Sequence, residues 1–256
     1  MILLKTPAEI EAMARAGAIL GQLLEAVGAR VAPGVSSAEL DAFAEEFIRA
    51  HDGAEPAFKG LYGFPASLCI SLNDEVVHGI PSPNRVLRDG DIVSIDAGVR
   101  LDGWYADAAV TQPVGAVDQT SARLLDVTRL ALDAGIARAT TRNRIGDIGA
   151  AVQQVAEKAG FNVVRDLVGH GLGRGPHEEP QVPNYGVPGR GIRLREGMVI
   201  AIEPMVNGGT SDVRTLADRW TVVTADGARS AHFEHTVAIT AAGPRILTSA
   251  PVPVRR

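Results

Sequence analysis

The hydrophobic positions at the N-terminal end of the chain repeat at helical spacing. Residues 6–9, Thr-Pro-Ala-Glu, form a capping box with proline at the first helical position, and apolar residues follow at three- and four-residue intervals up to Val27. Residues 36–39, Ser-Ser-Ala-Glu, form a second capping box, and the same spacing continues to Ile48. We therefore expect a first helix of about 20 residues and a second helix that ends near Gly53.

Shorter segments of β-type composition follow, and the order of helices and strands then repeats. The first predicted strands are 67–72, 91–99 and 104–114, with the tight-turn dipeptide Asp102-Gly103 between the last two. Two predicted helices, 118–140 and 145–159, precede predicted strands at 161–167, 197–206, 213–224 and 231–240. Two helices followed by strands, written twice, predict two related halves, 1–115 and 116–250, that share one sheet.

The length of 256 residues allows one large domain or two small ones. No Ser-rich or low-complexity linker separates the two halves. We therefore expect a single α+β domain over 1–256, with a loosely held tail at 250–256 that contains two prolines.

The predicted hairpin at Asp102-Gly103 places two acidic residues on one face of the sheet. With this dipeptide as a two-residue loop, Asp96 pairs with Ala109 and Asp107 lies diagonally beside Asp96. A shift of the loop by one residue puts the two aspartates directly opposite each other. In either register, two carboxylates share one face, where their charges repel each other.

The neighbours of Asp96 indicate that its side of the strand is not an ordinary solvent-facing surface. Apolar residues occupy the opposite face, and Asp96 shares its own face with Ser94 and Gly98. Carboxylates among small residues, with no obvious cationic partner, are costly to bury unless something neutralises their charge. A divalent metal ion would do so. For this segment alone, two aspartates on an exposed hairpin face remain an equal alternative.

Two later strands repeat this pattern with one acidic residue each. Glu203 interrupts the apolar run 198–205, and Glu234 lies within the run 232–239. A lone glutamate in a strand is usually an edge charge or half of a salt bridge. Four strand acids in one chain make that explanation less economical and favour one shared site.

A glycine-rich segment, 169–180, supplies two histidines seven residues apart, His170 and His177. Its glycines allow the backbone to approach a ligand closely, and we expect one or both histidines to face the site. A phosphate-binding loop is the alternative, but Pro176 and Pro180 interrupt any following helix and no Lys-Ser/Thr pair follows. A further histidine, His78, would by itself more often be a turn or core residue than a catalytic one.

Four carboxylates and one imidazole form a hard, oxygen-rich ligand set. Such a set suits a pair of first-row divalent ions, Mn, Fe, Co or Zn, better than a thiolate-rich structural zinc site. Two ions bridged by carboxylates can supply the nucleophile for hydrolysis. The residues therefore predict a metal-dependent hydrolase.

Composition narrows the class of partner and compartment. A net charge of −5 argues against nucleic acid, including DNA, as the main ligand, and we interpret the arginine-containing runs 142–144 and 190–195 as solvated surface. The single cysteine, Cys69, cannot form an intrachain disulfide. No apolar stretch is long enough to cross a membrane and no secretion signal opens the chain, so we expect a cytoplasmic protein.

Five blocks of the sequence, in order and at similar spacing, resemble those of type I methionine aminopeptidases, M24 metallopeptidases of the pita-bread fold. The blocks are 73–81, 94–107, 169–183, 202–207 and 233–236. The resemblance implies pseudo-symmetric halves around a central antiparallel sheet that is covered by two pairs of helices. It also implies removal of the initiator methionine from nascent proteins with a small second residue.

The resemblance implies a role for each candidate residue. Asp107 and Glu234 would bridge two divalent ions, Asp96 would complete one ion, and His170 with Glu203 would complete the other. Glu203 would also act as general base. His177 would hydrogen-bond the peptide group of the substrate, and His78 would contact the reacting region.

Further positions match the family less directly. Asn73 and Ser230 match positions that help to hold a monovalent cation, Na or K. The expected methionine pocket is apolar, and four residues fall at matching positions: Leu61, Phe64, Cys69 and Trp220. Phe58 stands where many bacterial members have cysteine, and Pro176 stands where an aromatic or larger residue is common, so the shape of this pocket departs from the family pattern.

Two other functions fit parts of the pattern. An Xaa-Pro aminopeptidase or prolidase shares the fold and a similar ligand set, but usually carries a large extra N-terminal domain and additional histidines around the glycine-rich segment. A non-catalytic binding protein of the same fold typically loses metal ligands, whereas all five are present here. For a methionine aminopeptidase we expect a monomer that acts on peptides and nascent chains with N-terminal methionine and makes transient contact with ribosomes.

Overall fold

The structure is a computed structural model that describes residues 1–249. The predicted loose tail, 250–256, lies outside the described residues. None of the helices within 1–249 combines the length and the hydrophobicity that crossing a membrane requires.

Four long helices form where the hydrophobic spacing predicts them. Both N-terminal capping boxes are present: in the first, the Glu9 amide donates to the Thr6 hydroxyl at 3.3 Å and the Thr6 amide donates to the Glu9 carboxylate at 2.8 Å. The second box joins Ser36 and Glu39 in the same way. The helices are α1 (Pro7–Gly28), α2 (Ser37–Arg49), α3 (Gln119–Arg138) and α4 (Ile145–Lys158), with a short 3₁₀ turn η1 (Leu61–Gly63).

The strands form one large sheet and two small ones. They are β1 (Ala54–Pro56), β2 (Leu68–Leu72), β3 (Glu75–Val77), β4 (Ile92–Leu101), β5 (Trp104–Pro113), β6 (Asn162–Val163), β7 (Gly169–Gly171), β8 (Glu178–Val182), β9 (Val199–Ile202), β10 (Met205–Asn207), β11 (Val213–Thr215), β12 (Val222–Thr224), β13 (Ser230–His232), β14 (Glu234–Thr240) and β15 (Gly243–Ile246). The large sheet runs β1-β4-β5-β14-β9-β7-β8, with β2 paired to β4 and β15 to β14. Every pairing is antiparallel, and strands from before and after residue 115 meet where β5 pairs with β14.

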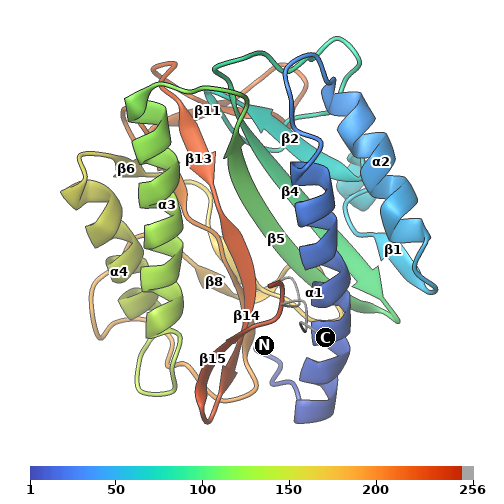
Figure 1. The fold of residues 1–256 in the computed structure, drawn as a ribbon. Coiled ribbons are helices and arrows are strands. Elements are labelled where there is room, and N and C mark those ends of the chain that lie inside the picture. The colour runs from blue at the N-terminus through green and yellow to red at the C-terminus, as the bar shows by residue number, and fades with distance from the viewer. Residues whose placement is uncertain (250–256) are drawn as a thin grey trace, which may run out of the picture.

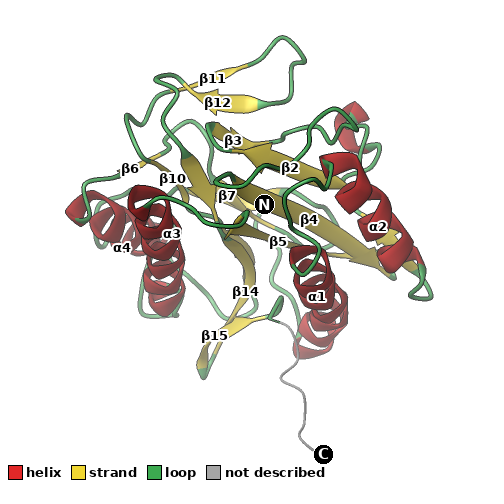
Figure 2. Cartoon of the chain, turned by 45° about the horizontal axis from the view of Figure 1, so that its top comes forward, coloured by secondary structure: helices red, strands yellow, loops and turns green. Residues whose placement is uncertain are grey.

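The helices pack in two pairs on one face of the large sheet. Figures 1 and 2 show α1 and α2 over the N-terminal strands and α3 and α4 over the C-terminal strands. Alternate residues of β4, including Val93 and Ile95, are fully buried in a core shared with α1 and α2. Ile200 of β9 and Val237 of β14 belong to a second core shared with α3 and α4. Residues of opposite parity on β4 therefore face away from α1 and α2.

The hairpin of β4 and β5 has the predicted register. Asp96 is paired with Ala109, and Gly98 is paired with Asp107, so the two aspartates are diagonal neighbours on one face. Asp102 and Gly103 both have positive φ, 51° and 78°, as a tight two-residue hairpin turn requires. The prediction of the shared face is confirmed.

Several strands differ from the predicted ranges. The segment 197–206 is divided into β9 and β10 at Glu203-Pro204, because proline has no amide hydrogen to continue the ladder. The segment 213–224 is not one strand, since the Asp218 carboxylate accepts the amides of Trp220 and Thr221, each at 2.9 Å, in a turn between β11 and β12. The glycine-rich segment forms the hairpin of β7 and β8, which we did not predict.

A threonine hydroxyl completes the seam between β5 and β14. The Asp107 amide donates to Thr236 Oγ1 at 2.9 Å, and this hydroxyl donates to the Asp107 carbonyl at 2.8 Å. Thr236 is fully buried, so no water can replace it. The single hydroxyl of Thr236 thus pairs both the amide and the carbonyl of Asp107, whose carboxylate is buried.

We predict that Thr236→Val destabilises the protein by about 1–3 kcal/mol, because the isosteric change leaves two buried backbone groups unpaired. Urea unfolding of the metal-free protein would measure the change. Thr215→Val, on the exposed strand β11, is the matched control and should have a much smaller effect. Equal stability of Thr236→Val and the parent would show that the hydroxyl contributes nothing net at this seam.

Candidate metal centre

Three neighbouring strands bring the first three acids together. Asp96 pairs with Ala109 across β4 and β5, and Ala109 pairs with Glu234 across β5 and β14. Asp96 and Glu234 therefore lie in one row, two strands apart, and Asp107 lies one diagonal step from Asp96. Because side chains alternate between the two faces of a strand, all three carboxylates point away from the helices.

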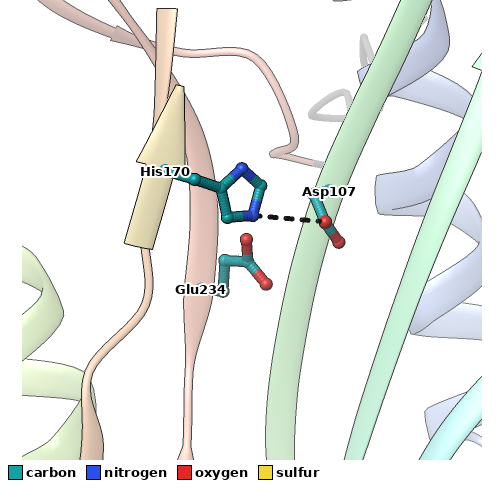
Figure 3. A group of neighbouring side chains, drawn as sticks. All are labelled: Asp107, His170 and Glu234. Carbon is teal, nitrogen blue, oxygen red and sulfur yellow. Dashed lines mark ion pairs between the residues drawn. The ribbon is translucent and has the colours of Figure 1, made fainter. Parts of the chain in front are cut away.

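The other two predicted ligands come from the next strands of the sheet. Glu203 directly follows β9, and His170 is the central residue of β7. His170 Nε2 lies 3.5 Å from Glu203 Oε1 and 3.9 Å from Asp107 Oδ2. One ligand atom from each of Asp107, His170 and Glu234 can be chosen so that all three lie within 4.8 Å of one another. Figure 3 shows these three side chains pointing toward a common centre from three strands.

The register continues through the strand breaks and sets Glu203 against Glu234. His235 pairs with Ile202 across β14 and β9, and His232 pairs with Met205 across β13 and β10. Both pairs belong to one antiparallel alignment, in which Glu203 and Glu234 face each other. At the break, the Phe233 amide donates to the Pro204 carbonyl at 3.3 Å, so the two short strands remain in step with the two longer ones.

The acids are buried without a cationic side chain. Asp96 is 9% exposed, Asp107 6% and Glu234 3%. Among residues 1–249, no lysine or arginine forms an ion pair with these three or with Glu203. One carboxylate oxygen each of Asp96, Asp107 and Glu234 is buried without any hydrogen-bond partner in the described part of the chain. Such oxygens are costly to leave unpaired, and cations would pair them.

The pKa values of the acids record the same lack of positive charge. Burial raises the pKa of Asp107 to about 7, against an opposing hydrogen bond from the Ala108 amide. Burial, and then the neighbouring Asp107, raises the pKa of Asp96 well above its ordinary value. Burial raises the pKa of Glu203 and of Glu234 well above the usual range, and the surrounding aspartates raise both further. Without cations, the site therefore holds protons at pH values where carboxyl groups are normally ionised.

His170 presents a neutral ring nitrogen to the acids. Its Nδ1 donates to the Gly171 carbonyl at 2.9 Å, which leaves a lone pair on Nε2, the atom that faces the acids. Burial and the nearby His177 lower the pKa of His170 to about 4. Hard oxygen donors and one neutral imidazole nitrogen, with unpaired buried oxygens between them, fit divalent metal ions.

A cleft of about 300 Å³ opens beside the acids. All five predicted metal ligands line it, and so do His78 and His177. The four predicted pocket residues, Leu61, Phe64, Cys69 and Trp220, line it as well. Phe64 and Trp220 meet edge to face at 5.1 Å between ring centroids, and Phe58 belongs to the same wall. The cleft thus has an acidic wall and an apolar wall.

The two remaining histidines of the prediction lie at the mouth and wall of the cleft. His177 packs edge to face against His170, with ring centroids 4.5 Å apart, and stacks on Tyr62, which is 75% exposed. Burial lowers the pKa of His177, and burial with His177 nearby lowers the pKa of His78. Both imidazoles are therefore neutral at neutral pH and can donate one hydrogen bond each without a positive charge.

Asn73 and Ser230, the predicted monovalent-cation residues, are also neighbours. The Ser230 amide donates to the Asn73 carbonyl at 2.8 Å. The Asn73 side chain already contacts Asp91 and the Ile92 amide, and the Ser230 hydroxyl donates to the Val206 carbonyl. Their role at a cation stays a prediction.

One histidine of the cleft escaped the sequence analysis. His232 is 2% exposed and lines the cleft, with Nε2 3.8 Å from Glu203 Oε2. It precedes Glu234 by two residues, and this period-two spacing was available in the sequence as a signal that both face the same side.

Comparison with known proteins agrees with the geometry. Residues 11–241 match metallopeptidase family M24. The chain belongs to this family. It is 56% identical to a methionine aminopeptidase of Clostridium perfringens, over 97% of this chain and 99% of that protein. A crystal structure of methionine aminopeptidase from Thermotoga maritima superposes with a TM-score of 0.95 and 46% identity, over 97% of this chain and all of that chain.

A more distant structure shares the fold. The prolidase from Pyrococcus furiosus superposes with a TM-score of 0.77 at 23% identity, and the match covers 97% of this chain but 66% of the prolidase chain. With these neighbours, the predicted pita-bread fold is confirmed, and membership of M24 makes the chain a metallopeptidase.

We predict that metal affinity rises with pH. The raised pKa values mean that each cation must displace protons from carboxyl groups, so protons compete below about pH 7 and the affinity falls as pH falls. For each proton that a cation displaces, the metal affinity should fall roughly tenfold for every unit by which the pH decreases in that range. Titration of metal-free protein with Co(II) at pH 6, 7 and 8 would measure this, with calorimetry in two buffers counting the protons released. A constant affinity from pH 6 to 8, without proton release, would contradict the shifted pKa values.

Proposed function

We propose that this protein is a methionine aminopeptidase that hydrolyses the first peptide bond of peptides and nascent proteins with N-terminal methionine and a small second residue. The observation that carries the proposal is the single buried cluster of four acids and His170 beside an apolar cleft. The near full-length similarity to methionine aminopeptidases supports the same activity.

Two divalent ions, Co, Mn, Fe or Zn, are proposed as the cofactors. Asp107 and Glu234, which lie between the outer ligands, would bridge the pair, with Asp96 on one side and His170 and Glu203 on the other. When bound, such ions polarise a carbonyl oxygen and lower the pKa of water. A monovalent ion, Na or K, beside Asn73 and Ser230 is part of the same proposal.

The remaining groups handle protons and the peptide. The carboxyl group of Glu203 has a raised pKa and lies at the edge of the cluster, where it can take a proton from water and pass it to the departing amine. His177 is a neutral donor at the mouth of the cleft and would donate to the carbonyl oxygen as negative charge develops there. His78, on the cleft wall, would contact the peptide next to the cut bond.

The apolar wall would select methionine. Leu61, Phe64, Cys69 and Trp220 offer no charged partner, and a thioether is an unbranched apolar chain that fits an irregular aromatic wall. Phe58 belongs to the same wall and stands at a position where many bacterial members carry the smaller cysteine. Binding at this wall would bring the scissile bond next to the acids, because Cys69 pairs with Asp96 across β2 and β4.

Prolidase activity is the closest enzymatic rival and is less well supported. The prolidase from Pyrococcus furiosus has about one third of its chain outside the match and shares 23% identity, a likeness that concerns the fold alone. We infer that the protein acts as a monomer in the cytoplasm, with transient contact to ribosomes during synthesis of its substrates.

We predict that protein loaded with Co(II) or Mn(II) cleaves Met-Ala-Ser and that a chelator abolishes the activity. N-formyl-Met-Ala-Ser should remain intact, because a free α-amine is needed beside the acids. Chromatographic detection of released methionine is the measurement, and Ala-Pro and Met-Pro dipeptides are the controls for prolidase activity. Cleavage that is indifferent to chelation, or faster on Xaa-Pro, would overturn the proposal.

We also predict that Glu203→Gln and His177→Ala each lower kcat by about 10²-fold or more, as expected for acid–base and oxyanion groups. His51→Ala, at the C-terminal end of α2 and outside the cleft, is the control and should keep full turnover. Steady-state kinetics on Met-Ala-Ser would separate kcat from KM. Near-normal kcat in either cleft variant would remove that residue from its role.

A further inference from the structure

The cleft contains a buried histidine that the proposed mechanism does not use. His232, the last residue of β13, is 2% exposed, and both of its ring nitrogens are buried without a hydrogen-bond partner among residues 1–249. A buried donor or acceptor left unpaired costs on the order of 1–3 kcal/mol. A leucine would fill similar space without that cost, so the imidazole has to be explained by something it contacts.

The backbone around His232 is held firmly. Its amide donates to Thr111 Oγ1 at 2.8 Å, and that hydroxyl donates to the His232 carbonyl at 2.7 Å. Thr111 lies in turn 2.8 Å from the Ser94 hydroxyl. Two residues of the N-terminal half therefore fix the residue from which the imidazole projects, and pairing with Met205 of β10 fixes it from the other side.

The imidazole faces the carboxylate of Glu203. His232 Nε2 lies 3.8 Å from Glu203 Oε2, while His170 Nε2 lies 3.5 Å from Glu203 Oε1. The two oxygens of one carboxylate thus face two different imidazoles. The 3.8 Å distance from His232 Nε2 to Glu203 Oε2 exceeds a hydrogen bond by roughly 0.6–1 Å. The terminal torsion of a glutamate is broad, so a small rotation of the Glu203 carboxylate brings this distance to hydrogen-bond length.

We propose that His232 is a positioning residue for Glu203. In the working enzyme its Nε2–H donates to Glu203 Oε2 and holds the carboxylate with Oε1 directed toward His170 and the bound cations. This inference rests on the proposed function of Glu203. His232 would orient the Glu203 carboxylate, which is proposed as both a metal ligand and a base, and would not contact the substrate.

Alternative explanations make different predictions. A plain core residue would affect stability only. A direct metal ligand would need the imidazole itself, and no amide could replace it. A residue that orients Glu203 should tolerate glutamine, whose amide N–H reaches about as far as Nε2, and should lose its effect once the Glu203 carboxylate is absent.

The experiment compares His232→Gln with two donor-free variants, His232→Leu and His232→Met, in the full-length chain. His51→Leu makes the same chemical change at the C-terminal end of α2, outside the cleft. Circular dichroism confirms folding, and the second donor-free variant serves if one of them fails to fold. Kinetics on Met-Ala-Ser are expected to show kcat lowered 10–100-fold in the donor-free variants, with KM changed by less than about twofold and His232→Gln within about threefold of the parent.

A second readout is independent of catalysis. Co(II) titration of the metal-free proteins, followed by visible absorbance, is expected to show roughly tenfold weaker binding in His232→Leu than in the parent. In a Glu203→Gln background, His232→Leu should weaken binding no further. An equal loss in both backgrounds, a loss in His232→Gln as large as in His232→Leu, or parent-like values in every variant would each overturn the inference. If the parent itself binds Co(II) but cleaves no Met-Ala-Ser, the proposed function fails, while the titration cycle still decides the contact between His232 and Glu203.

Discussion

The arrangement of this protein depends on the burial of four carboxyl groups on one face of a sheet that offers them no lysine or arginine. Charges of one sign in a low-dielectric site repel each other, and each also loses its hydration. Burial raises the pKa of these groups, to about 7 for Asp107, so without cations the carboxyl groups retain protons at a pH where they are normally ionised. His170, which burial keeps neutral, adds no positive charge that would compete with a metal ion.

Where β5 faces β14, side-chain hydroxyls pair backbone groups that carry residues of the site. Thr236 satisfies the backbone of Asp107, and Thr111 satisfies the backbone of His232, each through one hydroxyl that accepts and donates. The two threonines lie on opposite strands of the β5–β14 seam and act across it in opposite directions. Each hydroxyl pairs both backbone groups of a residue whose side chain lines the cleft, so both residues are held from a facing strand.

Much of the fold and the site follows from short-range signals in the sequence. The capping boxes fix the starts of α1 and α2, and the Asp102-Gly103 turn fixes the register that places Asp96 and Asp107 on one face. The β7–β8 hairpin was missed because its glycines and prolines have low strand propensity, and its pairing with β9 is a contact between distant segments. His232 was missed for a different reason: the acidic residue Glu234 is the unusual feature of the apolar run 232–239. The same alternation that directs Glu234 toward the site also directs His232 there.

The cleft has two chemically different walls, one suited to recognition of an apolar side chain and one suited to hydrolysis. Residues of β4, β5 and β14 supply the acidic wall from the rigid centre of the sheet, where both neighbouring strands restrict movement. The apolar wall comes from Cys69 of β2, from less regular chain around η1 and from the turn that carries Trp220. Selection of a side chain by an apolar wall would tolerate changes of shape, whereas the donor set would tolerate few, because the proposed ions are the positive charges that all four carboxylates would share. Differences within this fold should therefore accumulate on the wall formed by loops, and the sheet should keep the chemistry.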